Sequence, residues 1–208
     1  MKSKLWLKIV SIIVVSIICI FLTGLLVFNI YYIKSNVSGK SMYPTLNSTD
    51  RIFTNRFSKA KKGDIVVADI ENEENWTNKE DGNYVVKTLI ATAGDTIKIE
   101  PVDTFHYQLL VNDKVIYTKE LMVSVNSYYM FTSYVAENMF NTERIVDGAI
   151  KVLDGEVFIA GDNWEVSYDC FSCGPISEDS IIGRVDIVVP KNQNLVFGAI
   201  KGLFKLWF

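Results

Sequence analysis

The segment Ser38-Gly39-Lys40-Ser41-Met42-Tyr43-Pro44-Thr45-Leu46 opens the polar part of the chain, a few residues after a long apolar run ends. Two serines flank its glycine, and a proline follows within a turn, so the backbone is predicted to be tight and specific rather than a plain strand. An ordinary Ser/Gly/Pro loop has the same composition. Whether Ser41 does more than form a loop therefore depends on which side chains the rest of the chain can bring to it.

The apolar run that precedes this segment, Ile9–Ile33, carries no charge and has Asn29 as its only strongly polar residue. As a helix it would cover roughly 37 Å, enough to cross a hydrocarbon core of about 30 Å. Lys2, Lys4 and Lys8 come before it. The positive-inside rule therefore predicts a cytoplasmic N-terminus and an extracytoplasmic body.

A cleaved signal peptide is the competing interpretation of this run. Its apolar region would be about 7–15 residues long and would end in a small-x-small site, which 29–33 does not offer. We therefore expect a single-pass protein of the cell membrane: a cytoplasmic tail at 1–8, a retained transmembrane anchor at 9–33 and an extracytoplasmic domain at 34–190. The apolar segment 191–208 is too short to span; it is either a buried final segment or an amphipathic piece on the membrane surface.

The domain after the anchor is predicted to be mainly β, with an antiparallel sheet and the anchor as the main helix. Alternating or apolar runs between turn residues predict strands at 50–57, 64–70, 84–91, 96–100, 155–159 and 183–189, and a hairpin of 107–111 with 115–118. The polar, acidic residues 71–83 predict a surface loop. Residues 119–152 fit strand or short helix, and we expect an insert packed beside the main sheet.

Charge and cysteine content limit the partners. The whole chain has a net charge of −3, and four of its lysines lie before residue 35, so the domain itself is more acidic and is not expected to bind nucleic acid. Cys170 and Cys173 supply two ligands where a structural zinc needs four, so we expect no metal and no cofactor. The pair could be a disulfide or two free thiols.

A serine nucleophile needs a base, and the chain offers two candidates. His106 is the only histidine; a triad through it is open, although a structural role is the simpler one. Lys87 shares a strand face with Val85 and Leu89. It is either an edge lysine with its ammonium in water or a buried lysine with a lowered pKa, and a buried neutral amine could serve as the base of a Ser-Lys dyad.

A third segment follows the predicted strand at 155–160: Gly161-Asp162-Asn163-Trp164-Glu165-Val166-Ser167-Tyr168-Asp169-Cys170-Phe171-Ser172-Cys173-Gly174-Pro175. It is dense in turn formers and carboxylates. A polar loop with Asx turns would have this composition.

Taken together, these motifs and the anchor resemble bacterial type I signal peptidase (leader peptidase). The segment 38–46 matches its nucleophile box Ser-Gly-x-Ser-Met-x-Pro-Thr-Leu completely, and 61–67 is similar to its Gly-Asp-Ile-Val box. The lysine box is similar to 84–95, and the last box to 161–175. The resemblance covers about residues 1–190 and implies the antiparallel β-sheet catalytic fold that signal peptidases share with LexA-like repressors.

The resemblance also implies a role for individual residues. Ser41 would be the nucleophile and Lys87 the general base, while Ser38 would complete an oxyanion hole with the backbone N–H of Ser41. Ser167 would orient the lysine amine, with Asp162 and Asp169 in support. Shallow substrate pockets would be walled by Met42, Leu46, Val85 and Val86.

The implied function is a membrane-anchored serine endopeptidase that removes signal peptides from exported preproteins after small-x-small, Ala-x-Ala-like sites. The chain departs from the family pattern at Thr88 and Phe171, where arginines are expected, and at Ala93, where a proline is expected. A non-catalytic or pilus-dedicated assembly factor is the main alternative. A soluble self-cleaving repressor is a second one, which the anchor and the acidic domain disfavour.

Overall fold

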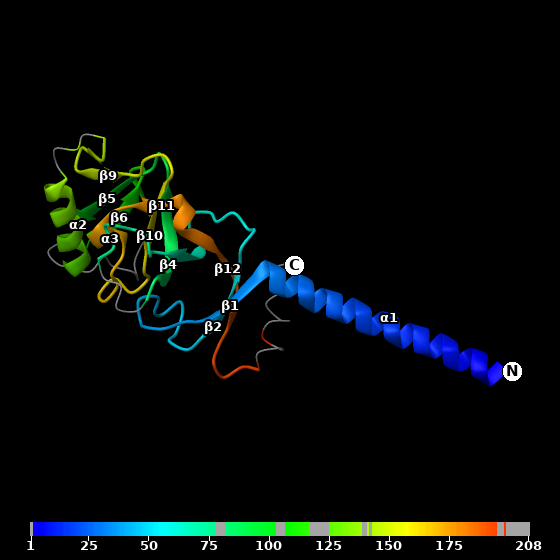
Figure 1. Ribbon diagram of the computed structural model, residues 1–208. Coiled ribbons are helices and arrows are strands. Elements are labelled where there is room, and N and C mark those ends of the chain that lie inside the picture. The colour runs from blue at the N-terminus through cyan, green and yellow to red at the C-terminus, as the bar shows by residue number, and fades with distance from the viewer. Residues whose placement is uncertain are drawn as a thin grey trace.

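The computed structural model describes residues 2–77, 82–102, 107–116, 125–138, 141, 143–194 and 198. One long N-terminal helix projects from a body that is built of two antiparallel β-sheets (Figure 1). The helices are α1 (Lys2–Tyr31), α2 (Val125–Glu137), α3 (Cys170–Cys173) and the 3-10 helix η1 (Glu178–Ser180). The strands are β1 (Tyr32–Asn36), β2 (Arg51–Asn55), β3 (Ile65–Asp69), β4 (Tyr84–Thr92), β5 (Thr96–Pro101), β6 (Tyr107–Val111), β7 (Lys114–Val115), β8 (Ile145–Val146), β9 (Ala149–Lys151), β10 (Glu156–Ala160), β11 (Ile176–Ser177) and β12 (Ile181–Val189).

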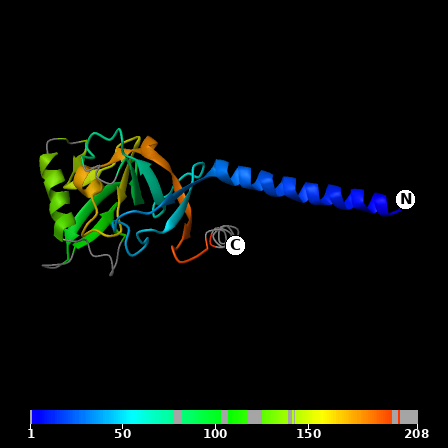
Figure 2. The ribbon, with the colours of Figure 1, turned by 60° about the horizontal axis from the view of Figure 1, so that its bottom comes forward.

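The larger sheet has seven strands in the order β1-β2-β12-β3-β4-β10-β11, and the smaller has five in the order β7-β6-β5-β9-β8. The strands nearest α1 are β1, β2 and β12, whereas the smaller sheet and α2 lie at the end of the body farthest from α1 (Figures 1 and 2). The predicted mainly antiparallel β fold with one N-terminal apolar helix is confirmed.

The strands predicted from alternation all occur, with ends that move by one or two residues. The hairpin turns at Asn112 and Asp113, both with positive φ, but its second strand, β7, is only two residues long. Residues 117–118 of the predicted strand lie outside the described residues. The expected insert contributes helix α2 and the strands β8 and β9, and β9 pairs with β5. This segment is therefore part of the second sheet rather than a piece lying beside the first.

The main core lies between the two sheets, because each has an apolar face that must be buried. The larger sheet contributes Leu89 and Ala91 to it, and the smaller sheet contributes Ile97 and Leu109, all at most 2% exposed. A smaller cluster around Met42, Leu46 and Ile52 buries the inner side of the loop at 37–50.

The junction between α1 and the body has no linker. The helix ends at Tyr31, and Tyr32 and Ile33, which we expected in the anchor, instead pair with Asn55 and Thr54 of β2. Strand β2 satisfies their backbone groups, so the apolar run continues past the point where the helix stops. The ring of Phe28 in α1 stacks on Tyr32 at 4.9 Å between centroids, which fixes the last turn of the helix against the sheet.

Within the described residues, one helix is long and apolar enough to cross a membrane, Trp6–Tyr31. None of its most apolar stretch is buried inside the protein. Its side chains are therefore available to lipid along most of its length, up to the last turn, where Phe28 packs against the body.

Candidate active site

Ser41 lies on the loop that joins β1 to β2. Hydrogen bonds between the backbones of Val37 and Asp50 and of Val37 and Thr49 close this loop at its base. Gly39 has a φ of +78°, which favours glycine. Ser41 is half buried, and within the described residues neither its hydroxyl nor its backbone N–H has a hydrogen-bond partner. Both groups are therefore free to act on a bound molecule.

Lys87 lies in β4 and is only 3% exposed. Of the two environments considered for it, the buried one is correct. Burial lowers the pKa of its amine below the ordinary lysine value, and the carboxylate of Asp169 opposes this shift. Its Nζ donates a hydrogen bond of 2.8 Å to the Ser167 hydroxyl. A larger fraction of Lys87 is therefore neutral near pH 7 than of an exposed lysine.

The Ser167 hydroxyl links Lys87 to a buried carboxylate. It donates its single hydrogen to Asp169 Oδ2 at 2.6 Å, so it can only accept from Lys87. Backbone N–H groups of Gly161 and Phe171 also donate to Asp169, at 2.9 and 3.1 Å. Burial raises the pKa of the Asp169 carboxyl, and these donors and Lys87 oppose the rise. Asp169 therefore holds its own loop through the two backbone N–H groups, and it holds the Lys87 amine through the Ser167 hydroxyl.

The loop at 161–169 is also attached directly to the serine loop. The backbone N–H of Asn163 donates to the carbonyl of Ser41 at 2.9 Å, and its side-chain amide donates to the carbonyl of Lys40 at 3.0 Å. At Gly161 a Cβ atom would lie less than 3 Å from both the Ser41 carbonyl oxygen and the Ser167 hydroxyl. Glycine is therefore required where the two loops meet.

The two positions that lack the expected arginine are filled in different ways. The Thr88 hydroxyl donates to Asp162 Oδ1 at 2.7 Å, so the carboxylate has a neutral partner. Phe171 is 1% exposed and packs edge-on against Phe158 and Trp164. The last loop is therefore held by a hydroxyl and by core packing rather than by a guanidinium group.

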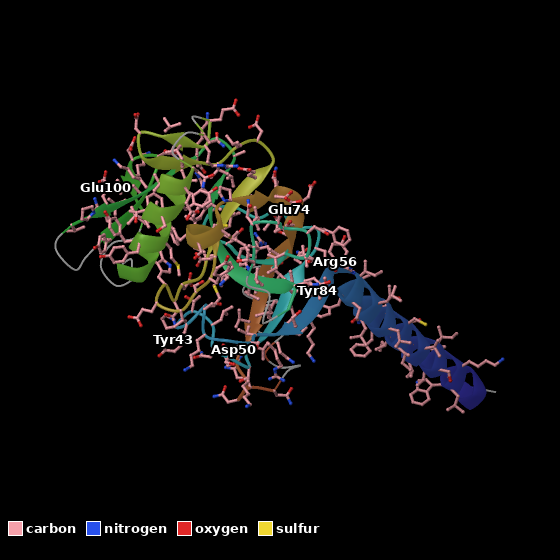
Figure 3. The ribbon with its side chains drawn as sticks, turned by 60° about the vertical axis from the view of Figure 1, so that its left-hand side comes forward. Tyr43, Asp50, Arg56, Glu74, Tyr84 and Glu100 are labelled. Atoms are coloured by element: carbon pink, nitrogen blue, oxygen red, sulfur yellow. The ribbon has the colours of Figure 1, made fainter. Side chains whose placement is uncertain are left out.

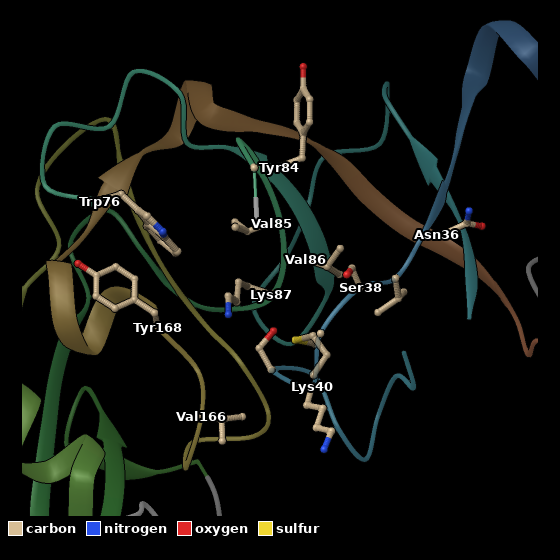
Figure 4. A pocket seen from close by; sticks show the side chains of 15 residues that line it. Asn36, Ser38, Lys40, Trp76, Tyr84, Val85, Val86, Lys87, Val166 and Tyr168 are labelled. Carbon is tan, nitrogen blue, oxygen red and sulfur yellow. The ribbon is translucent and has the colours of Figure 1, made fainter. Parts of the chain in front are cut away.

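These loops surround a cavity of about 420 Å³. Its lining includes Ser38, Ser41, Met42, Val85, Val86 and Lys87. Trp76 and Tyr168 stand at one end and Ser38 at the other, with Lys87 between them (Figure 4). No hydrogen bond joins the Ser41 hydroxyl to the Lys87 amine in the described residues, although both line this space. Catalytic hydrogen bonds of this kind often shorten only when substrate is bound.

One edge of β4 is open beside the cavity. Strand β3 pairs with Tyr84–Thr88, whereas β10 pairs with β4 only from Thr88 to Thr92. No strand of the described residues pairs with the other edge of 84–87. The unpaired backbone groups there can take up an extended peptide, which would run past Lys87.

Most of the predicted site residues thus come together, with one departure. Leu46 is 1% exposed and packs behind the serine loop with Ile52, and it is not among the residues that line the cavity. Leu46 therefore supports the serine loop from its buried side. His106 lies outside the described residues.

The state of the cysteine pair follows from its place in the same region. Cys170 and Cys173 are both buried free thiols in α3, so the disulfide alternative is wrong. The described residues contain no group of three His, Cys, Asp or Glu side chains that could hold a metal ion.

Trp76, Val166 and Tyr168 are among the residues of the cavity wall that sequence reasoning missed. Trp76 and Tyr168 are in edge-to-face contact at 5.7 Å between ring centroids. A tryptophan in an otherwise polar, acidic loop was the available signal, because tryptophan side chains are largely buried on average. Trp76 is in fact 2% exposed.

A family model described as signal peptidase, peptidase S26, matches residues 6–190. The chain belongs to this family. Signal peptidase I U of Bacillus subtilis is 31% identical over 189 residues, which are 87% of this chain and 88% of that protein. Signal peptidase IB of Staphylococcus aureus is 29% identical over 192 residues, 89% of each chain. A signal peptidase I crystal structure from Enterococcus faecalis aligns with 61% of this chain and 97% of its own, at 20% identity and a TM-score of 0.37.

Membership of the signal peptidase family confirms the resemblance seen in the sequence. The matched range includes α1 from Trp6 onward, both sheets and every residue of the candidate site.

Proposed function

We propose that this chain is a membrane-anchored serine endopeptidase that removes signal peptides from preproteins, with Ser41 as nucleophile and Lys87 as general base. Removal of signal peptides by a serine peptidase follows from the family. The observation that carries the choice of residues is that a buried lysine lines one cavity with a serine that has no hydrogen-bond partner among the described residues.

The hydrogen bonds around Lys87 leave its lone pair available. In the neutral amine, one N–H is donated to Ser167, whose only hydrogen is already given to Asp169. Ser167 therefore cannot bind the nitrogen lone pair, which remains free to accept the Ser41 hydroxyl proton. General-base transfer of this kind contributes about 10²–10⁴-fold to the rate.

The reaction then proceeds as an acyl transfer. Ser41 Oγ forms a bond to the scissile carbonyl carbon while its proton moves to Lys87 Nζ. The C–N bond breaks, and the protonated lysine gives that proton to the leaving amine. Water attacks the acyl-enzyme with Lys87 again as base, which releases the new carboxylate and restores Ser41.

The oxyanion of the tetrahedral intermediate needs donors that are not already occupied. Among the described residues the backbone N–H of Ser41 has no partner, and neither has the exposed hydroxyl of Ser38, which lines the same cavity. We assign these two groups to the oxyanion hole. Each donor of this type is worth about 3 kcal/mol in the transition state.

The substrate would bind as an extended strand on the open edge at 84–87. Met42, Val85 and Val86 would then form the walls that accept small side chains before the scissile bond. Close walls reject larger residues through overlap, so an Ala-x-Ala-like sequence is the expected cleavage site.

The non-catalytic alternative draws its support from the missing arginines. Thr88 partners Asp162 and Phe171 fills the core, so neither position leaves an unsatisfied group. This favours the enzyme over an assembly factor.

The anchor and its orientation complete the proposal. Helix α1 would cross the membrane once, with the basic N-terminus in the cytoplasm and residues 34–190 outside. Enzyme and signal peptide would then share one bilayer.

Cleavage of a purified preprotein with an Ala-x-Ala site tests the assignment. Ser41→Ala should abolish cleavage. Lys87→Met, which keeps the volume of the buried chain, should lower kcat by about 10²–10⁴-fold. Lys114→Met, on an exposed lysine of the second sheet, is the matched control and should cleave normally.

Thermal unfolding should show that all three variants remain folded. Cleavage by folded Lys87→Met at the normal rate would overturn the dyad. If His106→Ala were inactive as well, a histidine triad would replace it.

A further inference from the structure

A basic segment, residues 56–62, lies beside the end of helix α1. It reads Arg56-Phe57-Ser58-Lys59-Ala60-Lys61-Lys62, with four cations and no acid. The Arg56 guanidinium donates to the carbonyl of Ile30 at 3.0 Å, and its backbone N–H donates to the carbonyl of Tyr31 at 3.1 Å. Figure 3 shows Arg56 next to the end of the long helix. The segment is therefore fixed at the depth where the apolar helix ends.

An exposed aromatic side chain stands at the same place. Phe57 is 66% exposed, and its ring contacts that of Tyr31 at 5.0 Å between centroids. Tyr31 is the last residue of the candidate membrane span and is also exposed. Exposed aromatic rings at the end of an apolar helix are typical of residues that lie at the headgroup level of a bilayer.

Two of the cations in this segment have no internal partner. Lys59 and Lys61 are exposed, and within the described residues neither forms an ion pair. Lys62 differs, because its amine binds Asp95 at 2.9 Å. Asp64, the next acid along the chain, accepts the backbone N–H of Lys61.

The other acids on the inner side of the segment leave these two lysines unneutralised. Asp64 also lies 3.7 Å from Arg184, which in turn binds Asp186 at 2.7 Å. Glu178 lines the hollow behind the segment but forms no ion pair with it in the described residues. The outer surface of the segment therefore carries net positive charge on a chain whose overall charge is −3.

We infer that the basic segment 56–62 docks on anionic phospholipid headgroups of the membrane that α1 crosses. Lys59 and Lys61 supply the charge, Arg56 and Phe57 hold the segment at the helix end, and the Phe57 ring lies among the headgroups. Basic residues this close to a bilayer bind anionic lipid through screened Coulomb attraction, so the contact depends on lipid charge and on salt.

Lipid contact can be measured on the full chain in nanodiscs, independently of cleavage. A nitroxide is placed at Ser58→Cys in a Cys19→Ser background, where the remaining cysteines are buried. Collision with a water-soluble nickel reagent reports exposure of the label. We expect exposure to fall about twofold or more when one third of a phosphatidylcholine bilayer is replaced by phosphatidylglycerol, and to recover in high salt.

Charge reversal separates this proposal from a general effect of the bilayer. Phosphatidylglycerol should no longer protect the nitroxide from the nickel reagent in Lys59→Glu/Lys61→Glu. It should still do so in Lys114→Glu/Lys151→Glu, whose substitutions lie on the second sheet. Equal exposure in the two lipid mixtures would overturn the proposal. Protection that persists in pure phosphatidylcholine and in the Lys59→Glu/Lys61→Glu variant would show insertion of Phe57 alone, which also contradicts it.

Discussion

At the scale of single residues, the candidate site depends on one uncommon feature, a buried lysine with no direct carboxylate partner in the part of the chain that the structure describes. Lys87 is 3% exposed and reaches Asp169 only through the Ser167 hydroxyl. A direct ion pair would hold the amine in its charged form. The intervening hydroxyl keeps the amine in place while leaving burial as the dominant effect on its pKa.

The pH dependence of cleavage should reflect this arrangement. Only the neutral amine of Lys87 can accept a proton, so kcat/KM should rise with pH through the pKa of that amine. Since burial lowers this pKa, the midpoint should lie below the ordinary lysine value of 10.5. The measurement is kcat/KM for a peptide substrate across the pH range in which the enzyme stays folded.

A variant at Asp169 checks the origin of the midpoint. The charge of Asp169 raises the pKa of Lys87, so Asp169→Asn should move the rising limb to lower pH even if kcat falls. A limb that stays near 10.5 in the wild type, or that does not move in folded Asp169→Asn, would assign the titration to another group.

Sequence reasoning paired Ser41 with Lys87 because each lies in a short motif of specific spacing, and both residues line one cavity. Their catalytic roles stay a prediction. It could not anticipate Thr88, since the hydrogen bond to Asp162 joins residues 74 positions apart. The sequence shows that the expected arginine is absent, but only the fold shows which side chain takes over its contacts.

At the scale of elements, two loops that meet through a glycine bring the serine to the lysine. The serine loop follows β1, and the loop at 161–169 follows β10, while β4 carries Lys87 between them. Asn163 ties the two loops together through the carbonyl of Ser41.

Gly161→Ala should separate these loops. The added Cβ would lie less than 3 Å from the Ser41 carbonyl oxygen, an overlap that the backbone must relieve by moving. A displacement of about 1 Å at a catalytic group costs about 10²-fold in rate, so kcat should fall by roughly that factor. Steady-state cleavage kinetics, with a melting curve to show that the protein is folded, measure the effect.

Gly24→Ala is the matched control, because nothing lies within 4 Å of the Cβ it would add. It should cleave like the wild type. Normal kcat in Gly161→Ala would mean that the two loops need not be in contact during catalysis.

The elements themselves were predictable where apolar alternation was strong, as in β4 and β12. Strand β1 was missed because Tyr32 and Ile33 continue the apolar run of the helix, and only pairing with β2 separates them from it. Helix α2 was ambiguous because its aromatic residues suit a strand equally well, and packing against α3 decides the outcome.

At the scale of the whole molecule, the direct passage from α1 into β1 fixes the site relative to the membrane. Five residues of β1 separate the helix end from Val37, a distance of roughly 17 Å for an extended strand. Phe28, Tyr32 and Phe53 pack together at this junction, so the body cannot swing freely about the helix.

A flexible insertion should therefore uncouple the site from the bilayer. Six Gly/Ser residues between Tyr31 and Tyr32 would span about 13 Å on average and would break the stacking of Phe28 on Tyr32. For a preprotein embedded in the same vesicles, kcat/KM should fall by about tenfold, because the effective concentration of the scissile bond at the site decreases. For a soluble peptide with the same cleavage sequence it should not change, because that substrate reaches the cavity from solution. Equal losses on both substrates would show damage to the catalytic domain, and no loss on either would show that the junction does not set the height of the site.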